Sequence, residues 1–120
     1  MADGVEARLR EVPPLTIIDL RGEVTTFAED TINAAYRDAS ARGAEHILLN
    51  FAGVDYLNSA GIAIVIGILT ETRKREQSLL ITGLTPHYQK VLSMMGVSQY
   101  APVFPSEDEA LASVRGGQSS

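Results

Sequence analysis

The sequence predicts an α/β fold, a single domain with a mixed, mostly parallel sheet of about five strands and about four helices. Two observations predict it. Apolar segments with strand and helix periodicity alternate along most of the chain, which is typical of right-handed βαβ connections. Near the N-terminus, two strand-like segments are separated only by Pro13-Pro14, so the first strand should be an antiparallel edge of the sheet.

The first third of the chain predicts two strands and a helix. Apolar and polar residues alternate over residues 5–9, and a second strand spans Leu15 to Arg21 and ends at Gly22. The segment Thr26 to Glu29 has the capping-box form of a helix start, and Gly43 should end that helix. Its apolar face is expected to consist of Ala28, Ile32, Ala35 and Ala39.

The middle of the chain predicts a buried strand followed by an unusually apolar helix. The strand, His46 to Phe51, is a nearly continuous apolar run, as expected when both of its faces are covered. The helix extends from Ser59 to about Glu76, and its segment Ile62 to Leu69 has almost no polar side. A helix on a sheet normally has one charged face. Either neighbouring elements therefore bury this helix on both sides, or part of it binds a partner.

The last third predicts a further strand, a helix and a final strand. A short buried strand spans Leu79 to Thr82, and Thr85-Pro86 provides an N-cap followed by proline at the first helical position. Gly96 should end this helix, and a final strand is expected from Gln99 to Phe104. The apolar stripe of the helix is expected to consist of Tyr88, Val91, Leu92 and Met95.

A C-terminal helix is predicted from a second capping box, formed by Ser106 with Glu109. Small polar residues follow it, so residues 115–120 are expected to form a frayed tail and the core to span about residues 5–114. No repeat or linker divides the chain, so a single domain is expected to comprise residues 1–120. The apolar face of the last helix is expected to consist of Ala110, Leu111 and Val114.

Composition argues against several functional classes. The 120 residues are 45% hydrophobic and 21% charged, which is ordinary for a globular domain. A net charge of −5 argues against a nucleic-acid partner, because phosphate binding needs a basic surface. The chain has no cysteine, which excludes disulfides and fits a cytoplasmic protein. The longest apolar run, Ala60 to Leu69, is too short to span a bilayer, so no membrane insertion is expected.

Residues with catalytic or metal-binding chemistry are few and scattered. The two histidines, His46 and His87, are not at ligand spacing from one another or from a carboxylate pair. The glycines form neither a phosphate loop nor a dinucleotide-binding motif. We therefore expect no catalytic residue, no metal and no cofactor. A Ser/His/Asp triad assembled in space, as in a small hydrolase, stays open as an alternative.

The most informative segment is Asn58-Ser59-Ala60-Gly61, which joins the buried strand to the apolar helix. A serine at such a junction lies beside free backbone N–H groups and the positive end of the helix dipole. The site accepts a phosphate readily, and a phosphate there would add about −1.5 to −2 charges. The alternative is that Asn58 or Ser59 serves only as the N-cap of the helix.

This segment and an earlier one resemble a known family. The alternating order of strands and helices, with LRGEVTTFAED early and LLNFAGVDYLNSAGIAIVIGIL in the middle, resembles a STAS domain of the bacterial anti-sigma factor antagonists. The resemblance extends from about Val5 to Val114. It implies that Ser59 is phosphorylated by a partner that is both an anti-sigma factor and a serine protein kinase of the histidine-kinase-like ATPase fold. A phosphatase is a further partner that the resemblance allows.

Two positions differ from the usual pattern of that family. The residue before the phosphorylated serine is usually Asp and is Asn58 here, and the first loop often has Asp after Gly-Glu-Leu where this chain has Gly22-Glu23-Val24-Thr25. Thr25 is a second candidate phosphoacceptor, although it can instead cap the helix entry beside Thr26. The partner-binding surface is expected to include Gly22, Thr25, Asn58, Ser59, Ala60, Gly61, Ile62 and Ile66.

Together these features favour a non-enzymatic protein switch. In its unphosphorylated form, the surface around Ser59 would bind an anti-sigma factor and so release a sigma factor. A phosphate on Ser59 would weaken that complex by desolvation and by repulsion against carboxylates of the partner. The alternative is a constitutive STAS adaptor subunit of a signalling scaffold or transport complex, held through the apolar helix without phosphorylation.

Overall fold

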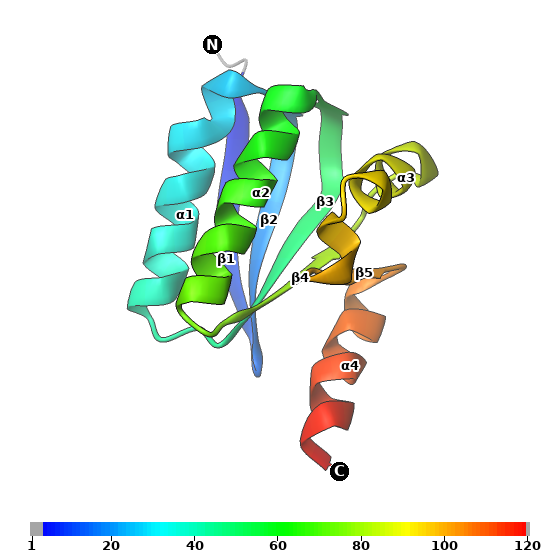
Figure 1. Ribbon diagram of the computed structural model, residues 1–120. Coiled ribbons are helices and arrows are strands. Elements are labelled where there is room, and N and C mark those ends of the chain that lie inside the picture. Colours follow the sequence, from blue (N-terminus) through cyan, green and yellow to red (C-terminus); the bar gives the residue numbers. More distant parts are fainter. Residues whose placement is uncertain (1–3, 120) are drawn as a thin grey trace.

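The computed structural model describes residues 4–119, and residues 1–3 and 120 lie outside the described part. Its helices and strands follow one another in the alternating order that the sequence predicts (Figure 1). The elements are β1 (Val5–Val12), β2 (Leu15–Val24), η1 (Thr26–Ala28), α1 (Glu29–Ala41), β3 (His46–Leu57), α2 (Ser59–Lys74), β4 (Ser78–Thr82), α3 (Pro86–Met94), η2 (Val97–Gln99), β5 (Val103–Phe104) and α4 (Glu107–Ser119).

The five strands form one mixed sheet in the order β1-β2-β3-β4-β5. Strand β1 pairs with β2 in antiparallel register, and the three following pairs are parallel. Helices α1 and α2 lie side by side across one face of the sheet, and α3 lies beyond β3 (Figure 1). The predicted fold class, a mostly parallel sheet with an antiparallel N-terminal edge strand and four α-helices, is confirmed for the described residues.

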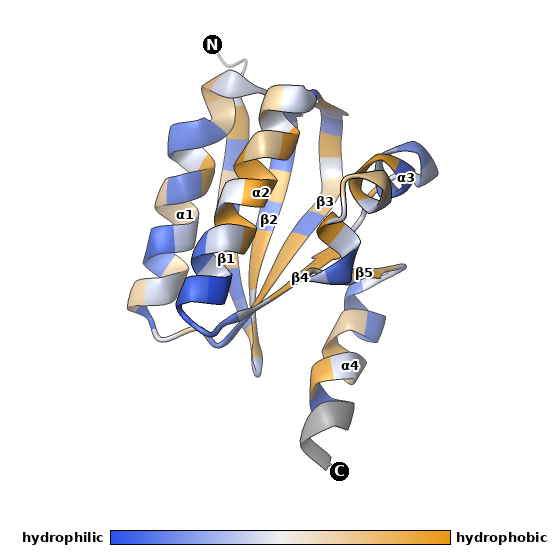
Figure 2. Ribbon diagram, viewed as in Figure 1, coloured by the Kyte–Doolittle hydropathy of each residue, from blue (hydrophilic) through white to orange (hydrophobic). Residues whose placement is uncertain are grey.

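The larger hydrophobic core lies between the sheet and the layer of α1 and α2. Helix α2 resolves the alternatives that its composition left open, because its large apolar side chains are mostly buried, whereas Ala63, Gly67 and Thr70 are exposed. Figure 2 shows hydrophobic residues along the middle of α2 and hydrophilic ones at its C-terminal end. The buried apolar side chains of α2 are Ile62, Ile64, Val65, Ile68 and Leu69.

A smaller core lies on the second face of the sheet, under α4. Ala110 is fully buried there, and Leu111 and Val114 pack against the same cluster, as the predicted apolar face requires. Ser106 caps the helix, since the backbone N–H of Glu109 donates to Ser106 Oγ at 3.1 Å, which is one of the two hydrogen bonds of the predicted capping box. Its backbone stays helical through Ser119. The strand residues of this cluster are Leu15, Ile17, Leu48 and Leu80.

An ion-pair network joins α4 to the two N-terminal strands. The guanidinium of Arg10 donates to Asp19 Oδ1 at 3.0 Å and to Glu107 Oε1 at 2.7 Å. Asn50 Nδ2 also donates to Asp19 Oδ1, at 2.8 Å. These hydrogen bonds, Arg10 first, hold the pKa of Asp19 below its ordinary value of 3.8, and the same carboxylates raise the pKa of Arg10.

We expect Asp19→Asn to lower the free energy of unfolding at pH 7 by about 1–2 kcal/mol, because charge-assisted hydrogen bonds contribute that much at a partly exposed site. A depressed carboxylate pKa stabilises the fold fully above the ordinary value of 3.8, and this contribution is lost as the pH falls through the lower folded value. Urea unfolding of both proteins should therefore show a difference that narrows below pH 3.8. The matched control is Asp38→Asn, which removes an exposed carboxylate from an i,i+4 pair and should change stability by less than about 0.5 kcal/mol. A difference independent of pH would contradict the network's role.

Three predicted boundaries are wrong. Strand β2 does not end at Gly22 but continues to Val24, and β3 continues past Phe51 to Leu57. Both strands pass through register shifts, after which the parallel ladder resumes. Gly22 fits this path because its φ is +102° and a Cβ would lie 2.5 Å from the carbonyl oxygen of Gly4. The predicted final strand is reduced to β5, because residues 97–99 form the 3-10 helix η2.

Two predicted details of the helices are also wrong. The cap at the first helix entry is Thr25 rather than Thr26, since Thr25 Oγ1 accepts the backbone N–H of Phe27 at 3.3 Å. A turn of 3-10 helix intervenes before α1 begins at Glu29. Met95 was expected on the apolar stripe of α3 but is 53% exposed, because Leu92 fills the core position of that helix.

Candidate functional site

The junction between β3 and α2 is organised by Asn58. Its backbone is extended, and its Oδ1 accepts the backbone N–H of Gly61 at 3.0 Å. Its carbonyl oxygen accepts the N–H of Ile62 at 2.9 Å, which starts the helical hydrogen bonding. Asn58 is therefore the N-cap. Ser59 is the first residue of α2, and its exposed hydroxyl takes no part in the cap.

Gly61 fixes where this junction lies. A Cβ on Gly61 would be 2.1 Å from the carbonyl oxygen of Val24 and 2.7 Å from Leu57 Cδ1. The first turn of α2 thus packs directly on the end of β2. Asn58 adds a second link, since its backbone N–H donates to the same Val24 oxygen at 3.4 Å. The glycine of the Ser-x-Gly motif is required by packing, and it places Ser59 beside the end of β2, at one end of the sheet.

The predicted surface residues differ in what they expose. Ser59 is exposed, and Ile66 is half-buried against the core. Ile62 is only 6% exposed and Gly61 is buried, so neither offers a side chain to a partner. This removes Ile62 from the predicted surface, because α2 turns that position toward the sheet. The other half-buried members of the set are Gly22, Thr25, Asn58 and Ala60.

Sequence reasoning missed Phe27, which is 90% exposed. It lies in η1, the turn that contacts the start of α2 at the same end of the sheet (Figure 1). The sequence did contain a signal. The apolar stripe of α1 starts at Ala28 and continues at Ile32, so the helical spacing leaves Phe27 without an apolar neighbour one turn later.

A hollow of about 250 Å³ lies beside Ser59, between the starts of α1 and α2. Its α2 side consists of the small residues Ala60, Ala63 and Gly67, with Ile64 below them. A Cβ on Gly67 would have no atom within 4 Å, so the hollow is open above that position. The α1 side is formed by Thr26, Glu29 and Asn33.

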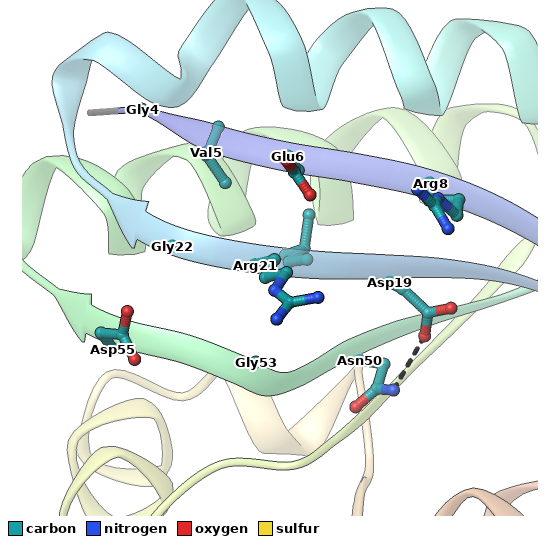
Figure 3. A pocket seen from close by; sticks show the side chains of 11 residues that line it. Gly4, Val5, Glu6, Arg8, Asp19, Arg21, Gly22, Asn50, Gly53 and Asp55 are labelled. Carbon is teal, nitrogen blue, oxygen red and sulfur yellow. Dashed lines mark hydrogen bonds between the residues drawn. The ribbon is translucent and has the colours of Figure 1, made fainter. Parts of the chain in front are cut away.

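A larger hollow, of about 790 Å³, lies on the part of the second sheet face that α4 leaves uncovered (Figure 3). Opposite charges face each other across it, because the β1–β2 register pairs Glu6 with Arg21 and Arg8 with Asp19. The lowered pKa of Asp19 keeps that carboxylate ionised at neutral pH, so it is not a proton donor. This hollow has the character of a charged, solvated sheet surface.

Of the two histidines, His46 lies at the opposite end of β3 from Ser59. The His46 ring is hydrogen-bonded to Ser78. The ring of His87 packs on Tyr88 at a centroid distance of 5.3 Å. Within residues 4–119, no group of three or more His, Asp or Glu side chains is arranged to hold a metal ion. In the same range, no helix combines the length and apolar character needed to cross a membrane.

The sequence model of one family matches most of the chain. The STAS domain model aligns with residues 6–110. The chain belongs to the STAS domain family. Its mixed five-stranded sheet and its four helices are therefore the features of a STAS domain.

Several relatives and solved structures similar to this STAS domain are anti-sigma factor antagonists, and a sulfate transporter family protein from Wolinella succinogenes is also similar, at 20% identity and a TM-score of 0.75 over 88% of this chain and 89% of that chain. BtrV of Bordetella bronchiseptica, a candidate anti-sigma factor antagonist, is 24% identical over 105 residues, which cover 88% of this chain and 90% of that protein. The phosphorylated form of the Bacillus cell fate determinant SpoIIAA is 25% identical, with 90% of this chain and 98% of that chain covered at a TM-score of 0.70. An anti-sigma factor antagonist from Mycobacterium paratuberculosis, 18% identical, covers 96% of this chain and 97% of its own at a TM-score of 0.83.

Proposed function

We propose that this STAS domain is an anti-sigma factor antagonist, a non-enzymatic switch in the cytoplasm that phosphorylation of Ser59 turns off. The observation that carries the proposal is that one residue of the junction caps the helix while the next exposes its hydroxyl. Asn58 caps the helix, so the exposed Ser59 hydroxyl is free for modification. The likeness to SpoIIAA, of which a phosphorylated form is known, supports the same conclusion.

In the unphosphorylated state, the surface around Ser59 binds an anti-sigma factor and so releases a sigma factor. The partner is also the serine kinase that modifies Ser59. A phosphate on Ser59 adds bulk and about −1.5 to −2 charges to a surface that the complex must enclose. Enclosing that anion requires its desolvation, which weakens the complex.

The fold itself should tolerate the phosphate. The Gly61 and Ile62 N–H groups are occupied by Asn58, but those of Ser59 and Ala60 have no partner within the helix. They and the helix dipole favour an anion at this position. Asn58 is neutral, so no carboxylate of the cap opposes the phosphate. Phosphorylation therefore acts on binding and leaves stability nearly unchanged.

The prediction is that Ser59→Asp keeps the thermal midpoint within about 2–3 °C of wild type, corresponding to less than about 0.5 kcal/mol. Its affinity for the anti-sigma factor should fall at least about 30-fold, equivalent to roughly 2 kcal/mol. Wild type and Ser59→Asp serve as baits in native lysate, and captured proteins are identified by mass spectrometry. Ser59→Ala is the matched control, which should still capture the partner.

The captured partner also tests the modification. Incubated with ATP, it should phosphorylate wild type on Ser59 and leave Ser59→Ala unlabelled. Thr25 is the second candidate acceptor, although its Oγ1 already accepts the N–H of Phe27. Label on Thr25 in Ser59→Ala would move the switch to that residue. Equal capture of a scaffold or transporter component by both baits would replace the switch with the constitutive adaptor.

A further inference from the structure

Phe27 is held outward by an ordered turn. Thr25 holds η1 in place through two hydrogen bonds. Its Oγ1 accepts the N–H of Phe27, and its carbonyl oxygen accepts the N–H of Ala28 at 2.9 Å. Ala28, the next residue, is 1% exposed in the core. The backbone on both sides of Phe27 is therefore anchored while its ring is 90% exposed. An aromatic side chain has only two rotatable bonds, so its binding costs little side-chain entropy when the backbone that carries it is already fixed.

The turn η1, which carries Phe27, borders the hollow between α1 and α2. Thr26, the residue before Phe27, forms part of the wall of that hollow, and Ala63 and Gly67 form its opposite side. These small side chains leave room for a partner to approach the backbone of α2 next to Ser59. The turn that carries Phe27, the hollow and the start of α2 with Ser59 thus lie together at one end of the sheet (Figure 1).

The two chain segments that form the surface around Phe27 and Ser59 carry no positively charged side chain. These segments, residues 22–36 and 51–70, contain no lysine, arginine or histidine. All ten Lys and Arg residues of the chain lie outside these segments. Arg21, which directly precedes the first segment, extends over the other face of the sheet, where its register partner is Glu6 (Figure 3). The exposed carboxylates at the start of α1 are Glu29 and Asp30, whereas Asp55 lines the hollow on the other sheet face together with Arg21 (Figure 3). Glu23 follows Arg21 by two residues on β2, so its side chain points to that other face as well.

We propose that Phe27 is the apolar anchor of the docking surface, and that Glu29 and Asp30 form an acidic rim beside it. The occupant is a protein partner that presents an apolar pocket flanked by lysine and arginine side chains. Aromatic residues inserted into such pockets carry a large share of interface energy, and complementary rim charges speed association. This inference rests on the proposed function, whose anti-sigma factor would be that partner.

The proposal also refines how the phosphate acts. A basic rim on the partner attracts an anion, so repulsion against partner carboxylates is not the reason for release. The phosphate on Ser59 would instead block docking through its bulk and its bound water, beside the hollow that the partner must enter.

The test uses the purified anti-sigma factor that wild type captures. Isothermal titration calorimetry measures its affinity for each variant, and surface plasmon resonance measures the association and dissociation rates. Phe27→Ala should weaken binding at least about 30-fold, as loss of an interface anchor does. The matched control is Met94→Ala, which removes another exposed apolar side chain, 77% exposed on α3, and should bind within about twofold of wild type. Gly67→Leu, whose Cβ meets no atom, should fill the hollow and also weaken binding while the domain stays folded.

The acidic rim is tested by charge reversal. Glu29→Lys and Asp30→Lys should each slow association about tenfold and reduce the salt dependence of the wild-type rate. Glu45→Lys, an exposed reversal before the opposite end of β3, is the control and should leave the rate unchanged. Normal binding by Phe27→Ala and by Gly67→Leu, with Ser59→Asp inactive, would overturn the anchor and leave the proposed function standing. Failure of wild type to capture any anti-sigma factor would overturn both.

Discussion

Replacing Gly61 by alanine should lower the free energy of unfolding by about 3 kcal/mol or more, at the upper end of what overpacking costs. The added Cβ would lie 2.1 Å from the carbonyl oxygen of Val24 and 2.7 Å from Leu57 Cδ1. The nearer of these atoms belongs to backbone that cannot move freely, because Val24 and Leu57 are paired at the end of the β2–β3 ladder. Relief would require α2 to shift away from the sheet.

Urea unfolding of Gly61→Ala beside Gly67→Ala separates this clash from helix propensity. Both substitutions add one methyl group to the same helix, but at Gly67 no atom lies within 4 Å of the new Cβ. Gly67→Ala should therefore gain up to about 1 kcal/mol, the usual preference of a helix for alanine over glycine. If Gly61→Ala were as stable as Gly67→Ala, the start of α2 would not be pressed on β2, and the position of Ser59 would not be fixed by packing.

Local sequence patterns were sufficient for most of the element starts. Thr85 with Pro86 and Ser106 with Glu109 mark helix caps within a few residues, and the structure shows the hydrogen bonds that these caps require. The failures occur where distant parts of the chain decide. Residues 52–57 include Gly53 and Asp55, which are typical of turns, so the segment resembles a loop, yet β2 pairs with it and makes it part of a strand. Residues 99–102 resemble a strand, but the 3-10 turn after Gly96 buries Val97 and Ala101 instead.

Local sequence predicts some features of the candidate site, and tertiary packing decides the others. The cap at Asn58 and the hydroxyl of Ser59 follow from their place between a strand and a helix, and the structure assigns the cap to Asn58 alone. The exposed side of α2 could not be read from its composition, because nearly every residue there is apolar. The position of α1 determines it, by leaving Ala63 and Gly67 uncovered. Phe27 was missed for the opposite reason, since an aromatic residue at a helix entry usually packs inward.

The second large effect on stability is expected from a substitution on the buried side of α2. Ile62→Asp should lower the free energy of unfolding by at least about 4 kcal/mol, because it empties a core position and buries a carboxylate without a partner. Ala63→Asp, one residue later, should cost less than about 1 kcal/mol, since that side chain is exposed near the N-terminal end of the helix, where a negative charge is favoured. Unfolding by denaturant, monitored by circular dichroism, measures the stability of both variants.

The two variants also decide which substitution can probe partner binding. Loss of binding in Ile62→Asp would reflect unfolding, whereas Ala63→Asp places its charge in the hollow beside Ser59 on a folded domain. An Ile62→Asp variant that folded with near-wild-type stability would show that this side chain can leave the core, and would return Ile62 to the partner-binding surface that the sequence predicts.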